Sequence, residues 1–111
     1  FVLNLFTELG FHVLERSKVM EIAWIAQRET KFVLQFIESE QHPLPTETKI
    51  FTHIAFITED PKKEIERIKQ WIQSQDVTVV DGKWTDKEFW LDCPEVFIDF
   101  VLEIMHTSVV E

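Results

Sequence analysis

The stretch IFTHIAFITED, from Ile50 to Asp60, alternates in the way of a strand that is half-buried in a sheet. Successive side chains of a strand point to opposite faces. One face would therefore hold Phe51, His53, Ala55 and Ile57, and the other Ile50, Thr52, Ile54 and Phe56. A histidine thus lies among apolar side chains on one face of the predicted strand. Its imidazole would need a polar partner there or would have a functional role.

The residues after this strand predict a helix and three more strands. PKKEIERIKQWIQSQ, residues 61–75, reads as a helix because Asp60 can cap it and Pro61 suits its first turn. Its apolar stripe would consist of Ile65, Ile68, Trp71 and Ile72. Further strands are predicted at 77–82, 87–93 and 96–106. The second half of the chain therefore runs strand, helix, strand, strand, strand.

The first half predicts the same order without a leading strand. FVLNLFTELG reads as the end of a helix, and Gly10 suits a left-handed cap. Strands are predicted at 11–17, 19–27 and 31–40, with a tight connection at RETK, residues 28–31. Aligning the two halves sets KFVLQFIESE against DFVLEIMHTS, which places Gln35 opposite Glu103.

A linker with two prolines separates the halves. QHPLPTETK has no periodicity, and neither Pro43 nor Pro45 can donate to a sheet ladder, so we predict that both lie outside the strands. We therefore predict a single α+β domain over 1–111, with an incomplete first unit at 1–40, a linker at 41–48 and a second unit at 49–111.

Composition excludes several classes of protein. The net charge is -9, from 11 Lys and Arg against 20 Asp and Glu, which disfavours nucleic acid as a partner. No apolar run approaches the roughly 20 residues of a membrane span. Cys93 is the single cysteine, which excludes an internal disulfide framework. With no signal peptide in view, we expect a soluble protein in a reducing cytoplasm.

The order of elements, together with FTELGFHV (6–13) and THIAFITED (52–60), resembles the vicinal oxygen chelate superfamily. That superfamily includes glyoxalase I, extradiol dioxygenases, fosfomycin resistance proteins and bleomycin-binding proteins. The resemblance implies tandem βαβββ units whose sheets curl into a barrel-like mixed sheet with a cleft. It also implies that metal ligands come from the first and fourth strands of each unit.

For the second unit, the resemblance implies His53 and Glu103 as ligands of a divalent metal, with Glu103 also catalytic. Imidazole with carboxylate suits zinc, nickel, manganese or iron. The residue pattern agrees, because Glu103 lies in a strand that is apolar on both sides, where an unpaired carboxylate would cost several kcal/mol. The third ligand would come from the first strand of the first unit, which this sequence does not contain.

Gln35 stands where the glyoxalase I pattern has a carboxylate. An amide is a weaker ligand, so we expect Gln35 and Trp90 to line a substrate pocket. His12, His42 and His106 show no metal-ligand spacing, and Cys93 has no basic neighbour that would activate it. Asp99, four residues from Glu103, would be about 13 Å away along a strand.

Two functions remain open from the sequence. The first is a metal-dependent enzyme of the glyoxalase or dioxygenase type, acting on a small molecule chelated through adjacent oxygens. The second is a metal-free protein of the resistance type that binds or sequesters a small molecule on the same fold. In either case we expect a homodimer, because the incomplete first unit leaves an edge strand open to pairing.

Overall fold

A computed structural model of the chain describes residues 1–17, 22–26 and 33–110, with the side chains of 14–17, 22–24, 26 and 33 outside that description. The chain divides into two compact units, Phe1–Glu40 and Gln41–Glu111. The predicted connection at 28–31 lies outside the described residues. Within the described residues, no helix has the length and apolar character needed to cross a membrane.

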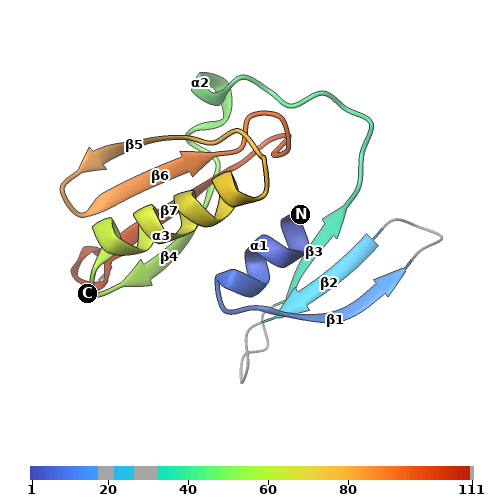
Figure 1. Cartoon of the computed structure of the whole chain (residues 1–111), viewed down its shortest axis with the longest axis horizontal. Coiled ribbons are helices and arrows are strands. Elements are labelled where there is room, and N and C mark those ends of the chain that lie inside the picture. Colours follow the sequence, from blue (N-terminus) through green and yellow to red (C-terminus); the bar gives the residue numbers. More distant parts are fainter. Residues whose placement is uncertain (18–21, 27–32, 111) are drawn as a thin grey trace. The chain divides into compact units, whose positions relative to one another are not determined.

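The first unit packs a short helix on a three-stranded sheet (Figure 1). It contains α1 (Val2–Glu8), β1 (His12–Ser17), β2 (Ile22–Ala26) and β3 (Val33–Ile37), with antiparallel strands in the order β1-β2-β3. The ring of Phe6 lies 4.8 Å from that of Phe36 and 5.6 Å from that of Phe11, between centroids. Gly10 has φ 98°, which confirms the predicted left-handed residue after the helix.

The second unit contains a mixed sheet of four strands. Its elements are α2 (Thr46–Lys49), β4 (His53–Thr58), α3 (Pro61–Ser74), β5 (Val80–Thr85), β6 (Glu88–Asp92), β7 (Val101–His106) and the 3-10 turn η1 (Thr107–Val109). The strand order is β4-β7-β6-β5, in which β4 runs parallel to β7 and the other pairs are antiparallel. The sheet is not closed. This confirms the predicted α+β class, whereas the tandem relation of the two units stays a prediction.

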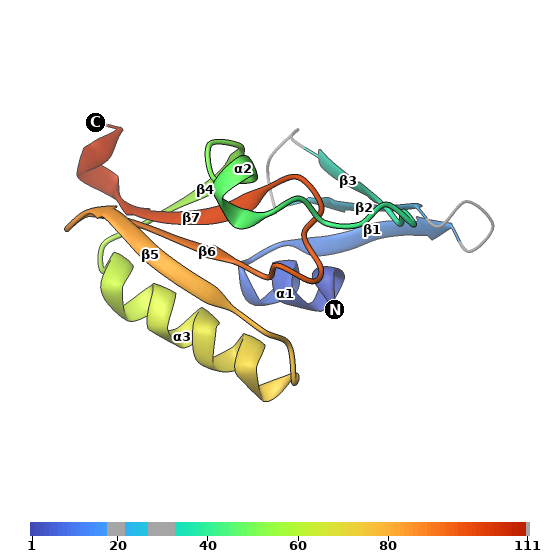
Figure 2. The same ribbon diagram turned by 90° about the horizontal axis from the view of Figure 1, so that it is seen from above.

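Helix α3 covers one face of this sheet (Figure 2). Asp60 caps its first turn, since the Asp60 side chain accepts a hydrogen bond from the Lys63 backbone amide at 3.2 Å. Ile65, Ile68 and Ile72 are buried, as the apolar stripe predicts. On the sheet, Leu91, Leu102 and Ile104 are also buried, and these six side chains form the part of the core between α3 and the sheet.

Several strand boundaries differ from the sequence prediction. The opening strand begins at His53 rather than Ile50, because Thr52 follows a turn in which its amide bonds the Lys49 carbonyl. The last strand begins at Val101 rather than residue 96, because the amides of Val96 and Phe97 bond the Cys93 carbonyl in a turn. Asp99 therefore lies in a loop, not on a strand face shared with Glu103. Val80, rather than residue 77, begins β5.

The predicted linker contains the short helix α2, which a buried charge pair anchors to the sheet. Lys49 Nζ lies 3.0 Å from Asp92 Oδ1 and donates a hydrogen bond to the Phe97 carbonyl. The ion pair between Lys49 and Asp92 Oδ1 lacks hydrogen-bond geometry. The other carboxylate oxygen, Asp92 Oδ2, accepts a hydrogen bond from Thr46 Oγ1 at 2.6 Å. Both charged side chains are fully buried. Pro43 lies outside all strands, and so does Pro45, as predicted.

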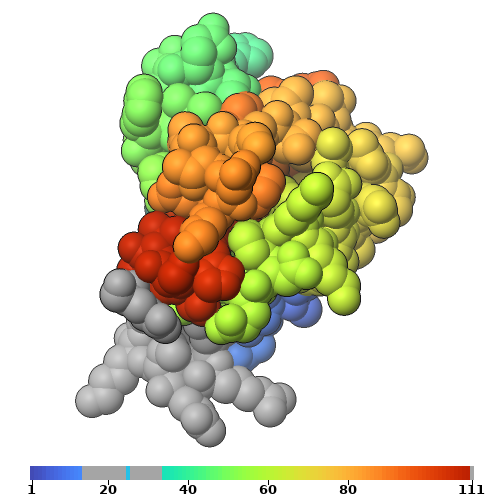
Figure 3. All heavy atoms as spheres, turned by 90° about the vertical axis from the view of Figure 1, so that its left-hand side faces the viewer, coloured from blue at the N-terminus to red at the C-terminus, as the bar shows by residue number. Residues whose placement is uncertain are grey.

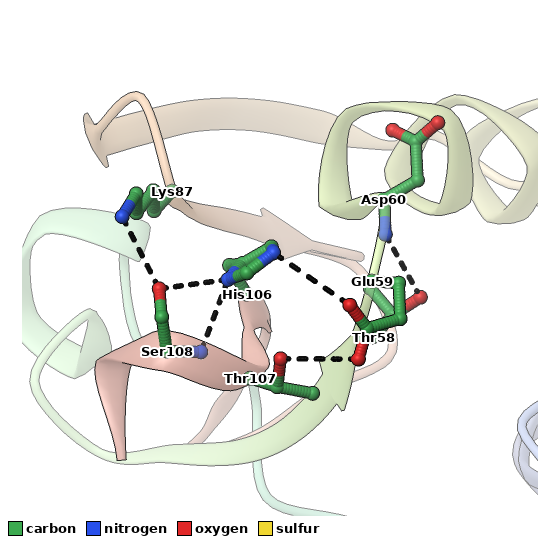
Figure 4. Close-up of polar contacts among 7 residues, drawn as sticks. All are labelled: Thr58, Glu59, Asp60, Lys87, His106, Thr107 and Ser108. Carbon is green, nitrogen blue, oxygen red and sulfur yellow. Dashed lines mark hydrogen bonds and ion pairs between the residues drawn. The ribbon is translucent and has the colours of Figure 1, made fainter. Parts of the chain in front are cut away.

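A polar network ties the end of β7 to the turn before α3 (Figure 4). His106 Nδ1 accepts from the Ser108 amide at 3.0 Å and so caps η1. Thr107 Oγ1 donates to Glu59 Oε1 at 3.2 Å, and Lys87 Nζ donates to the Ser108 hydroxyl at 3.2 Å. Figure 3 shows the red C-terminal residues beside the yellow-green start of α3 on the surface. The network accounts for His106 as a structural residue.

Candidate functional site

The candidate site lies on the face of the second sheet that α3 leaves uncovered, here called the open face. Asp81 marks the covered side, because its carboxylate pairs with Lys69 of α3 at 2.9 Å. Strand alternation then assigns the neighbouring positions to the open face. The register across the sheet places Ala55, Glu103, Trp90 and Gly82 in one row. The other residues of this face are His53, Ile57, Val80, Glu88, Asp92, Val101 and Met105.

The structure brings His53 and Glu103 together on the open face. His53 is the first residue of β4, and Glu103 is the third residue of the parallel strand β7. His53 Nε2 lies 3.1 Å from Glu103 Oε2, with side-chain exposures of 32% and 6%. The histidine in the opening stretch thus has a partner, Glu103, which is the residue that the family resemblance paired with it.

Burial of Glu103 changes its acidity. Desolvation raises the pKa of the Glu103 carboxyl above its ordinary value, the charge of His53 opposes this rise, and the charge of Glu88 adds to it. The carboxyl therefore keeps its proton to a higher pH than an exposed glutamate does. A cation placed beside it would favour the ionised form.

Trp84 contacts His53 from the opposite edge of the sheet. The two rings lie 5.2 Å apart between centroids, at an interplanar angle of 45°. Because β4 and β5 are the two edge strands, this contact requires a curled sheet whose edges approach across the open face. A bulge between Lys83 and Thr85 interrupts the register at Trp84 and frees this side chain from strict alternation. The indole is 37% exposed.

Trp90 lies on the other side of Glu103, and Gly82 makes room for it. A Cβ atom at Gly82 would come within 2.6 Å of Cζ2 of Trp90, so the indole lies directly across the glycine. Sequence analysis named Trp90 as a lining residue but missed Gly82 and the contact of Trp84. Both residues lie within β5, and no periodic pattern in the sequence marks either of them.

Gln35 belongs to the first unit. It lies on β3, exposed, one position before Phe36, whose ring packs on Phe6 of α1. Gln35 thus points away from α1, as Glu103 points away from α3 in its own unit. Its assignment to a pocket stays a prediction, and so do the roles assigned to His53, Glu103 and Trp90.

The His53 and Glu103 donors fit two positions on one metal ion. Donor atoms that each lie about 2.0–2.2 Å from an ion, at angles of about 90–110°, are themselves about 2.8–3.6 Å apart. The observed 3.1 Å lies within that range. In the part of the chain that the structure describes, no third His, Cys, Asp or Glu joins the pair. The two side chains are therefore spaced as two ligands of one ion would be, and metal binding by them stays a prediction.

The other residues that the sequence analysis considered are a buried cysteine, two exposed histidines and a loop aspartate. Cys93 is buried, and desolvation raises the pKa of its thiol to about 12, so it is not a nucleophile at neutral pH. His12 and His42 are exposed, and Asp99 lies in its loop. The sequence analysis left these residues out of the site, and that stays a prediction.

Comparison with known proteins identifies the fold. No family profile matches the sequence, and no curated protein matches it. Among solved structures, an integron cassette protein from the mobile metagenome of the Halifax Harbour sewage outfall has a TM-score of 0.56 at 19% identity, covering 93% of this chain and 84% of that one. The fosfomycin resistance protein FosX from Listeria monocytogenes also has a TM-score of 0.56, at 12% identity, covering 93% of this chain and 81% of that one. Both have the vicinal oxygen chelate fold, and so does this chain.

Proposed function

We propose that this chain uses the open face of its second sheet to bind a small molecule, and that His53 and Glu103 hold a divalent metal there. The observation that carries the proposal is the 3.1 Å separation of His53 Nε2 and Glu103 Oε2 on that face. This distance matches that between adjacent ligands of one metal ion. Burial disfavours the ionised carboxylate of Glu103, and a bound cation would offset that cost. A third protein ligand would come from outside the described residues.

The substrate would be a small molecule with two adjacent oxygen atoms that can bind the metal. A bound divalent ion would polarise two adjacent substrate oxygens. The chain itself contributes Glu103, whose pKa is raised by burial, so its carboxyl keeps a proton to a higher pH than an exposed glutamate does. His53 orients that carboxylate as its ion-pair partner, while Trp84 and Trp90 shield the pair from water and face the apolar part of the ligand.

Metal titration tests the proposal. We expect the purified chain to bind Zn(II), Ni(II) or Mn(II) in isothermal titration calorimetry, and His53→Ala or Glu103→Ala to weaken that binding about 100-fold or more. His42→Ala and Glu66→Ala are matched controls, because both residues are exposed, His42 lies outside the strands and Glu66 lies on α3. The metal site is refuted if the parent binds none of these ions, or if the site variants bind them like the controls.

A second candidate is a metal-free binding protein. His53 and Glu103 already form an ion pair, and Trp84 and Trp90 flank them, so a ligand could bind without an ion. FosX is a resistance protein, and sequestration of a toxic compound is the resistance activity that such a face would support. Ligand affinity that is unchanged by a chelator would favour this candidate over the enzyme.

A further inference from the structure

The two strands that carry the candidate pair begin at the same end of the second sheet. β4 opens with His53 and runs parallel to β7, so that His53 is in register with Val101, and Ala55 with Glu103. β4 is an edge strand of this sheet, paired with β7. A shift of one residue in that pairing would turn the His53 side chain to the other face, away from Glu103. The contacts that fix the starts of both strands therefore also fix the His53–Glu103 pair.

Lys49 lies where the chain enters both strands. It is the last residue of α2 and stands four residues before His53. Its Nζ atom donates a hydrogen bond to the carbonyl of Phe97, which stands four residues before Val101, the first residue of β7. The Lys49 carbonyl accepts from the Thr52 amide, and the Thr52 carbonyl accepts from the Val101 amide, both at 2.9 Å. Lys49 is thus connected to the first residue of each strand.

Asp92 and Thr46 hold the Lys49 side chain in this place. Lys49 Nζ lies 3.0 Å from Asp92 Oδ1, and Asp92 Oδ2 accepts from Thr46 Oγ1 at 2.6 Å. Both charged side chains are fully buried, so the desolvation of two charges offsets much of their attraction, and the net gain in stability is small. A buried charged pair can instead favour one arrangement of the chain over its alternatives.

From these contacts we propose that Lys49 is a positioning residue for the His53–Glu103 pair. The buried ion pair of Lys49 with Asp92, here called the entry clamp, holds the starts of β4 and β7 in the register that brings the two site residues together. The inference rests on the proposed function where it concerns metal binding, and it gives Lys49 a role that the proposed function does not use. Lys49 acts through the backbone that leads into each strand.

A double variant separates this role from stability. Lys49→Met with Asp92→Asn removes both charges at nearly constant side-chain volume, whereas Lys49→Met alone would leave a buried carboxylate without its cation. Thr46→Val, which removes one hydrogen bond to Asp92, is a milder second variant. Lys69→Met with Asp81→Asn is the matched control, because that ion pair, 2.9 Å long, also joins a helix to a strand but lies on the covered side of the sheet. Circular dichroism checks that each variant folds.

Metal titration measures the effect on the candidate site. In calorimetric titrations with Zn(II), Ni(II) or Mn(II), we expect the double variant to bind metal about tenfold or more weakly than the parent, as when a residue that orients metal ligands is lost. Thr46→Val should weaken binding about twofold or more, in line with the loss of one hydrogen bond. The control variant should bind metal like the parent.

Hydrogen exchange of the metal-free chain measures the entry clamp without any ion. The Val101 amide bonds the Thr52 carbonyl at the strand starts, and the amide of Ile68, in the middle of α3, reports global unfolding. We expect the Val101 amide to exchange about tenfold or more faster relative to that of Ile68 in the double variant than in the parent. The control should keep the parent ratio. A general loss of stability would not raise this ratio, because it would also speed exchange at Ile68.

The inference is overturned if the clamp variants that fold bind metal like the control variant. It is equally overturned if the ratio of Val101 to Ile68 exchange is the same in the clamp variants as in the control. Failure of the proposed function gives a different result. If the parent chain binds none of the three ions, the metal site is refuted, and the exchange ratio still decides whether Lys49 holds the two strands in register.

Discussion

Glu103 is a buried carboxyl in a strand whose neighbours Leu102 and Ile104 are aliphatic and buried. Burial at such a position makes the ionised carboxylate less stable, and the pKa of Glu103 is raised for that reason. His53 offsets only part of this destabilisation. A residue that is costly for folding and placed on an uncovered face is typical of a functional site, where stability is given up for chemistry.

Replacing Glu103 by glutamine tests this cost. Because the pKa of Glu103 is higher in the folded than in the unfolded chain, its stabilising effect is complete below the unfolded pKa and is lost as pH rises through the folded pKa. Glu103→Gln should therefore unfold at a higher denaturant concentration than the parent at pH 8, with little difference at about pH 4. Urea unfolding at both pH values measures this, with Glu66→Gln as control. A variant that is less stable at pH 8 would show that attraction by His53 outweighs desolvation.

Gly82 is the second residue whose role can be isolated. Gly82→Ala places a Cβ atom against the Trp90 ring, and relief of that overlap should cost about 1–3 kcal/mol of unfolding free energy. In a double-mutant cycle, the same change in a Trp90→Leu background should cost clearly less, because the smaller side chain leaves room. Equal costs in the two backgrounds would show that the glycine serves the backbone rather than the indole.

At the level of elements, the sequence predicted α3 well because its signals are local. Asp60, Pro61 and the stripe of isoleucines define a helix at 61–75, and the structure has 61–74. The start of β7 was mispredicted, since VFIDF alternates like a strand but Phe97 turns back to bond the Cys93 carbonyl. Helix α2 was missed because its support is the distant carboxylate of Asp92. Periodicity contains no information about either contact.

The stripe of α3 makes a stability prediction. Ile68 is fully buried between the helix and the sheet, so Ile68→Ala should lower the unfolding free energy by about 2–5 kcal/mol. Gln70→Ala, at an exposed position of the same helix, should change it by no more than about 0.5 kcal/mol. Urea unfolding followed by circular dichroism measures both. Similar small losses in the two variants would mean that α3 does not pack as described.

At the level of the whole molecule, the candidate site was predictable only in part. The repeat alignment and the resemblance selected His53 and Glu103, because strand order brings the first and last strands of the unit together. Trp84 and Gly82 could not be found in the same way. Their positions depend on the curl of the sheet and on a bulge in β5, neither of which leaves a pattern in one sequence.

The open sheet also leads us to expect self-association. Ile57 on the edge strand β4 is 56% exposed and Val80 on the other edge strand is 39% exposed, and an unpaired edge can pair with another chain. We therefore propose a homodimer in solution. Sedimentation velocity at micromolar concentration should show a species of twice the 13.2 kDa chain mass. A single monomeric boundary that persists as concentration rises would contradict this proposal.

The parallel pairing of β4 with β7 has a kinetic consequence. It joins the beginning of the second unit to its end, whereas β5, β6 and β7 are linked by short connections. Pairing across such a long stretch of chain closes a large loop, so it is expected late in folding, after the hairpins have formed. His53 and Glu103 meet only when this last pairing is made. A ligand that bridges them would therefore leave the folding rate nearly unchanged and slow the unfolding rate instead.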